Sequence, residues 1–171
     1  MLFPHNQVKI LPYNRIVKDL NGLAVEAFLA RVDKKFVRRP ADHKAPVKSR
    51  EFGMFVDEQW HLLEARPGTF DAADPVASLD VSILQQNLLA PVLGIEDPRT
   101  DKRIDFVGGI RGTGELEKKV QSGLFKVAFA LFPTNIDQLM AVADKGRIMP
   151  PKSTWFEPKL KDGLAVHMIG A

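Results

Sequence analysis

The stretch best suited to binding an anion is a glycine-rich turn that follows a short apolar run. Residues 103–115 read RIDFVGGIRGTGE, which predicts a strand, then a glycine turn, then the start of a helix. The first N–H groups of a helix have no partner within it and attract phosphate or carboxylate groups. Arg111 and Gly112 are the predicted anion-binding residues here, because a guanidinium can hold such a group through two hydrogen bonds. The alternative is a turn whose glycines only let strand and helix pack closely, since neither nucleotide-binding glycine pattern is matched.

A second candidate is the proline-rich run at residues 149–159, which reads MPPKSTWFEPK. Its three prolines fix the backbone and remove hydrogen-bond donors, so the loop is expected to be stiff. Lys152, Ser153 and Thr154 can then hold three donors around a phosphate. The alternative is that Trp155 and Phe156 fill the core while the polar residues only face solvent.

Residues 97–105 combine three acidic with three basic side chains. Asp101 and Asp105 are candidates for an acid or for holding a magnesium ion that carries a phosphate ligand. The competing interpretation is a surface loop with weak, screened ion pairs. Asp80 is the other candidate acid, and its position between apolar residues predicts either exposure or burial with a partner.

Several kinds of chemistry are excluded by the residue types. The chain has no cysteine, which excludes disulfides, thiolate metal sites and a cysteine nucleophile. Its four histidines have no metal-binding spacing, so no metal site is predicted from them. No serine lies in the G-x-S-x-G pattern of hydrolases.

The composition predicts one domain over residues 1–171 in the cytoplasm. Of 171 residues, 45% are hydrophobic and 26% are charged, which is ordinary for a globular protein. No apolar segment is long enough to span a membrane, and the first residues do not form a signal peptide. The chain opens on an apolar run, Met1–Phe3, which suggests the carboxyl-terminal part of a longer protein. Burial of Leu2 and Phe3 against a second copy would make it a homo-oligomer.

The net charge of +3 is unevenly distributed. Residues 31–50 hold eight Lys or Arg against two acids, and residues 36–50, which contain two prolines, are interpreted as a basic loop. A solvated connector beside an acidic face is the preferred interpretation. A nucleic-acid partner is not expected, because such binders carry a larger basic excess.

The predicted elements indicate an α+β fold with a mixed sheet, helices mainly on one face and a β-hairpin. Residues 125–132 are apolar on both faces and are the predicted central strand, flanked by residues 103–107 and 164–169. The remaining predicted strands are 7–11 and the hairpin 52–56 with 60–64, and the predicted helices are 21–35, 74–90, 113–123 and 135–144.

Four runs together resemble one family. They are LPYNRIVKDLNGL (11–23), DPVASLDVSILQQNLLAPVLGI (74–95), DPRTDKRIDFVGGIRG (97–112) and IMPPKSTWFEPKLKDGL (148–164). These runs resemble the carboxyl-terminal half of bacterial and archaeal proteins known as domain of unknown function 1015. The resemblance implies an upstream half with a ParB- and sulfiredoxin-like fold, a fold that includes free serine kinases. It also implies that the missing amino-terminal half is a partner and that a nucleotide with magnesium is the cofactor.

Three functions are open at this point. The first is the phosphate- or nucleotide-binding half of a phosphotransferase-like, kinase-like enzyme, with this fragment inactive alone. The second is a nucleic-acid-associated domain that uses the basic residues 31–50. The third is a packing or dimerisation module without its own ligand.

Overall fold

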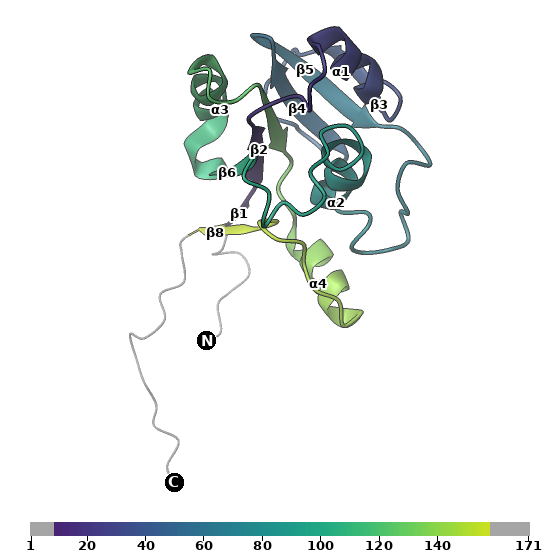
Figure 1. Ribbon diagram of the computed structural model, residues 1–171. Helices are drawn as coiled ribbons and strands as arrows, with labels where there is room; N and C mark the ends of the chain where they lie inside the picture. Colours follow the sequence, from purple (N-terminus) through teal and green to yellow (C-terminus); the bar gives the residue numbers. More distant parts are fainter. Residues whose placement is uncertain (1–8, 158–171) are drawn as a thin grey trace.

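A six-stranded antiparallel sheet organises the protein, and its strand order is β3-β5-β4-β7-β2-β6. The structure is a computed structural model and describes residues 9–157. A smaller antiparallel sheet pairs a strand near each end of the described chain (Figure 1). The strands are β1 (Lys9–Leu11), β2 (Tyr13–Val17), β3 (Phe36–Pro40), β4 (Glu51–Val56), β5 (Gln59–Ala65), β6 (Ile104–Gly108), β7 (Val127–Leu131) and β8 (Trp155–Glu157).

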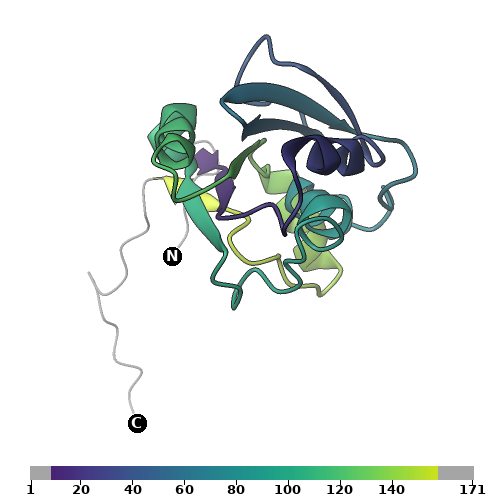
Figure 2. The same cartoon turned by 45° about the horizontal axis from the view of Figure 1, so that its top comes forward.

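Helices cover both faces of the large sheet. α1 and α2, with the π-helical turn η2 that continues α2, lie on one face, and α3 lies on the other (Figures 1 and 2). None of the helices within residues 9–157 is long and apolar enough to cross a membrane. The helices are α1 (Val25–Val32), α2 (Asp80–Leu84), η2 (Gln85–Leu89), the 3-10 turn η3 (Gly109–Arg111), α3 (Gly112–Gln121) and α4 (Ile136–Asp144).

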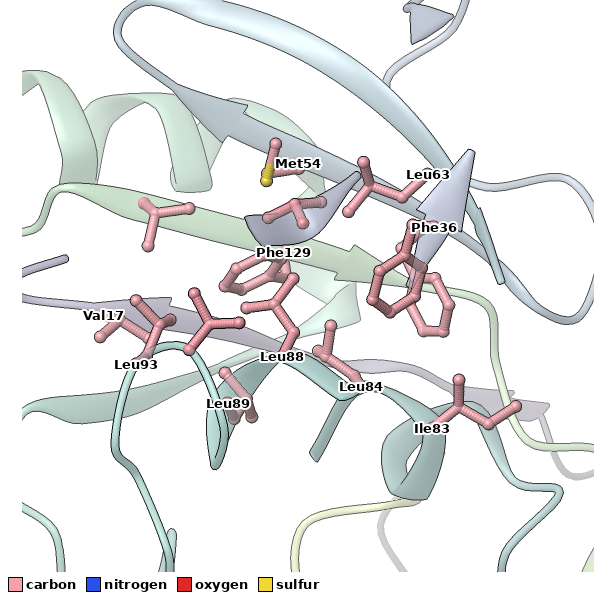
Figure 3. Packing of buried hydrophobic residues seen from close by; sticks show 14 of the residues in the cluster. Val17, Phe36, Met54, Leu63, Ile83, Leu84, Leu88, Leu89, Leu93 and Phe129 are labelled. Atoms are coloured by element: carbon pink, nitrogen blue, oxygen red, sulfur yellow. The ribbon is translucent and has the colours of Figure 1, made fainter. Parts of the chain in front are cut away.

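The larger core lies between the sheet and the helices α1 and α2. Figure 3 shows Leu84 and Leu88 pointing from the α2–η2 helix toward Phe36 and Phe129 on the sheet. A smaller cluster on the opposite face packs Leu116 of α3 onto the sheet. The predicted α+β class is therefore confirmed. All described pairings of the sheet are antiparallel, where the sequence predicted mixed strand directions.

The predicted central strand is confirmed, but its predicted neighbours are wrong. β7 lies in the interior of the sheet and all five of its residues are buried. Its neighbours are β4 and β2, and β6, which covers the predicted strand 103–107, is an edge strand beside β2. The hairpin strand β4 takes the place beside β7, a pairing that local sequence does not reveal. Residues 164–169, together with Leu2 and Phe3, lie outside the described residues.

Two segments in which the sequence predicted no strand form strands in the structure. The first predicted strand, 7–11, was the only one expected before residue 52, yet β2 begins directly after Pro12. The basic loop was predicted over residues 36–50, yet β3 occupies its first five residues. The reason is tertiary packing, because the Phe36 ring meets the Phe52 ring edge-on at 5.7 Å inside the core.

Two predicted helices are shorter than expected. The helix predicted from residue 74 begins at Asp80, because Asp74 Oδ1 accepts the N–H groups of Val76 and Ala77 in a separate turn. The helix predicted over residues 21–35 is α1, which follows Ala24. By contrast, α4 begins as predicted, with Asn135 and Gln138 forming a reciprocal capping box.

The remainder of the basic loop is held by buried and partly buried acids. Arg39 and His43 converge on the carboxylate of Glu51, at 3.2 and 3.1 Å, and the Val47 N–H donates to it. Burial raises the pKa of Glu51, but these donors outweigh burial and hold that pKa below its ordinary value. Of the eight basic residues in 31–50, four form ion pairs, namely Arg38, Arg39, Lys44 and Lys48.

Candidate anion-binding site

The proline loop lies across the end of the large sheet, beside the glycine turn. Tyr13 of β2 is paired in register with Gly108 of β6. The Lys152 Nζ lies 5.3 Å from the centre of the Tyr13 ring. The centres of the Tyr13 and Trp155 rings are 5.2 Å apart. A Cβ at position 108 would lie 2.5 Å from the Trp155 ring, so a glycine is needed there. The two segments that the sequence singled out are therefore neighbours in space.

The backbone of this loop is anchored while its polar side chains remain available. Lys152 has a φ of +53°, a left-handed conformation that is strained for a lysine. Ser153 is buried, and its carbonyl accepts a hydrogen bond of 3.3 Å from Thr134 Oγ1. Within residues 9–157, the hydroxyl groups of Ser153 and Thr154 make no hydrogen bond. They are thus free to bind a ligand.

Arg111 approaches the same end of the sheet from the other face. Tyr13 and Val17 share one face of β2, and Val17 belongs to the core under α2. Arg111 lies at the start of α3, which covers the opposite face; its side chain is 64% exposed and lies 4.0 Å from Glu115. Gly112, with a φ of +67° and open space around its Cα, begins the helix. We predict that Arg111 and Lys152 nevertheless border one concave surface.

The acids predicted near this site are engaged elsewhere. Asp101 forms an ion pair of 2.8 Å with Arg103, and this contact holds the pKa of Asp101 below its ordinary value. Asp105 is exposed and accepts the N–H of Phe106. Glu157 accepts a hydrogen bond from the Trp155 ring. Across the part of the chain that the structure describes, no group of three or more potential metal-ligating side chains is present.

Sequence reasoning missed the most unusual charged residue, Arg15 of β2. Its residue surface is only 4% exposed, and no carboxylate within residues 9–157 forms an ion pair with it. The guanidinium donates to the carbonyl of Tyr13 and, at 3.5 Å, to that of Pro151. It also lies 5.2 Å from the centre of the Phe106 ring. Burial lowers the pKa of Arg15 to about 9, so it is still charged at neutral pH.

The sequence carried one indication of this residue. Arg15 and Val17 alternate with Asn14 and Ile16, so the arginine shares a face of the strand with the apolar Val17. The interpretation of Pro12 as a strand break concealed this alternation.

Arg15 lines a pocket of about 390 Å³ on the face of the sheet that α2 covers. Asp97 and Arg99, which both line it, form an ion pair of 2.9 Å with each other. The other lining residues are Val81, Ser82, Gln85 and Gln86 from the α2–η2 helix, Glu96 and Pro98 from the loop that follows, and Pro150 and Pro151 from the proline loop. This cavity, with Arg15 in its wall, is called the Arg15 pocket below.

Asp80, the other candidate acid, is buried at the start of α2. Its Oδ1 accepts the N–H of Arg50 at 2.9 Å, whereas its Oδ2 has no hydrogen-bond partner within the described residues. Burial raises the pKa of Asp80 to about 7. Asp80 does not line the Arg15 pocket.

Solved structures with this fold include a kinase. "Free serine kinase in complex with AMP" matches with a TM-score of 0.53 at 11% identity, over 87% of this chain and 54% of that chain. "Conserved hypothetical protein from Pyrococcus furiosus" matches with a TM-score of 0.51 at 15% identity, over 87% of this chain and 56% of that chain. At these identities the likeness is one of fold alone. This chain spans about half the length of both structures.

No curated protein matches the sequence significantly. The amino-terminal part, residues 1–82, matches the model of a family described as "Protein of unknown function (DUF1015)". That match agrees with the resemblance inferred from the sequence motifs. Residues 1–82 of this chain are therefore similar to the DUF1015 family.

Proposed function

We propose that this chain is the phosphate- or nucleotide-binding half of a phosphotransferase-like enzyme. Lys152, Ser153 and Thr154 hold the phosphate from the proline loop, and Arg111 and Gly112 approach it from the glycine turn. The observation that carries the proposal is the position of the proline loop, which sets Lys152 over the ring of Tyr13, the residue paired with Gly108.

The charges around this loop support an anion as the ligand. No carboxylate within residues 9–157 lies in ion-pair distance of Lys152, and Asp101, Asp105 and Glu157 contact other groups. A lysine held in a strained backbone conformation, with two free hydroxyl groups after it, is arranged for a ligand rather than for stability. A phosphate would satisfy all three side chains at once.

The fold likeness supports a nucleotide as the source of that phosphate. One solved structure of similar fold is a free serine kinase in complex with AMP, and this chain matches about half of it. Any phosphoryl transfer therefore depends on a further half as well. A magnesium ion would enter with the nucleotide, and Asp105 is the acid available to meet it because Asp101 is held by Arg103.

Titration with AMP, followed by isothermal calorimetry, tests this proposal. We expect saturable binding to the unmodified protein and a loss of affinity of about tenfold in Lys152→Ala and in Arg111→Ala, because each variant removes one charge-assisted hydrogen bond. Lys145→Ala, which removes an exposed lysine just after α4, is the control and should bind AMP normally. Absence of AMP binding, or unchanged binding in both test variants, would reject the proposal.

A packing or dimerisation module remains the second candidate function, because α4 exposes apolar side chains. Met140 is 51% exposed and Ile136 lies one turn before it, while Ile148 after the helix is 88% exposed. We expect light scattering at micromolar concentration to give a dimer, and Met140→Glu to give a monomer. A monomer in the unmodified protein would count against this candidate.

A further inference from the structure

We infer that the Arg15 pocket is a binding site for a small oxyanion, a carboxylate or a phosphate, separate from the nucleotide-binding loop proposed above. The ligand would lie between the sheet, the α2–η2 helix and the proline loop, with the Arg15 guanidinium as its anchor.

The hydrogen bonds of Arg15 leave most of its donors for a ligand. A guanidinium has five N–H groups, and the carbonyls of Tyr13 and Pro151 use two of them. The remaining donors have no acceptor within residues 9–157. A buried charge without an opposite charge is costly to the folded state, so arginines of this kind are normally paired. An oxyanion in the adjoining cavity supplies the missing charge and the missing acceptors.

The pocket wall provides a second polar contact at the same place. Ser82 is 6% exposed and lines the pocket, and its hydroxyl makes no hydrogen bond within the described part of the chain. Its hydroxyl can donate to an anion held by Arg15. Ser82 lies in α2, three residues before the start of η2, a π-helical turn of the kind that occurs frequently at functional sites.

The size and charge of the pocket define the class of ligand. A volume of about 390 Å³ is at the small end of ligand pockets and suits a compact molecule. Val81, Pro150 and Pro151 are apolar walls that limit water around the guanidinium. At the rim, Asp97 and Arg99 neutralise each other, and Glu96 is exposed. Glu96, unpaired within residues 9–157, disfavours a highly charged polyphosphate and leaves a small oxyanion as the fitting ligand.

This pocket is distinct from the proposed nucleotide-binding loop. Neither Lys152 nor Arg111 lines it. Pro151 belongs to its wall, whereas the next residue, Lys152, lies over Tyr13. Because different side chains bind the two ligands, variants can separate the two sites.

Calorimetric titration of the full chain with inorganic phosphate and, separately, with malonate tests the inference. We expect at least one of the two anions to bind, and its affinity to fall at least thirtyfold in Arg15→Met but less than twofold in Lys152→Ala. Phosphate binding alone identifies a phosphate ligand, and malonate binding alone identifies a carboxylate. Failure of both anions to bind, or loss of binding in Lys152→Ala with retention in Arg15→Met, overturns the inference.

Thermal unfolding separates a binding role from a structural one. Without anion, Arg15→Met should raise the Tm by a few degrees, because it replaces an unpaired buried charge by an apolar side chain of similar length. A lower Tm would show that Arg15 serves the fold. Ser82→Ala provides a second test, with anion affinity reduced about fivefold at an unchanged Tm; unaltered affinity would count against the site.

The AMP titration distinguishes the proposed nucleotide binding from anion binding in the Arg15 pocket. If both hold, Arg15→Met retains AMP binding and loses the small anion, whereas Lys152→Ala does the reverse. If AMP fails to bind while the small anion binds through Arg15, the proposed nucleotide function is rejected and the Arg15 pocket stands.

Discussion

Asp80→Asn is expected to make the protein more stable than the unmodified protein at pH 8, while the two should be close in stability near pH 4. The pKa of Asp80 is about 7 in the folded protein and 3.8 as an ordinary aspartate. Between these two values the unfolded chain loses the proton while the folded protein keeps it. The stability contributed by the protonated carboxyl is therefore full below pH 3.8 and is lost as the pH rises to 7.

The size of this effect follows from the pH range between the two pKa values of Asp80. At about 1.4 kcal/mol per pH unit, the loss approaches about 4 kcal/mol across it. Urea unfolding between pH 4 and pH 8 measures the difference, and the asparagine variant should lack this component. Ser82→Ala alters the same helix without removing a titratable group, so its difference from the unmodified protein should be constant with pH. A constant difference for Asp80→Asn as well would contradict the prediction.

Gly53→Ala is expected to lower the free energy of unfolding by about 3 kcal/mol. A Cβ at this position of β4 would overlap the backbone carbonyl of Lys44, and it would lie 3.1 Å from the Trp60 ring and 3.3 Å from Ala130. Because the carbonyl belongs to the backbone, the overlap can be relieved only by moving the loop or the strand. Chemical denaturation would show the loss as a lower midpoint.

Gly114→Ala is the matched control for this substitution. Gly114 lies in α3 with open space around its Cα and without a positive φ. Alanine there should stabilise the protein by about 0.5–1 kcal/mol, because it favours the helix and restricts the unfolded chain. If both variants changed stability equally, a steric cause at Gly53 would be ruled out.

Local sequence patterns were sufficient to predict those helices and strands that are specified by their own residues. The hairpin of β4 and β5, the strand β6 and the helices α3 and α4 were all predicted within a few positions. The double-sided burial of β7 was also predicted, because a strand that is apolar on both faces needs cover on each side. In the candidate site, the sequence identified the glycine turn and the proline loop by composition alone.

Other elements were decided by long-range contacts. Phe36 makes a strand of a basic segment because its ring packs on Phe52 from another strand. β6 is at an edge and β4 is beside β7 because pairing depends on partners distant in sequence, which a local pattern does not specify.

The sequence by itself indicated candidate anion-binding residues, and only the tertiary structure decided which of these segments lie side by side. Lys152 lies beside the glycine turn because the smaller sheet pairs β8 with β1 and draws the proline loop back toward β2. Arg111 begins a helix on the opposite face, since the turn at Gly108 leads the chain across the edge of the sheet. Arg15 becomes a buried cation because α2 and Pro151 cover β2 from segments far away in sequence. Burial is a property of such packing, so no reading of residues 11–17 in isolation reveals it.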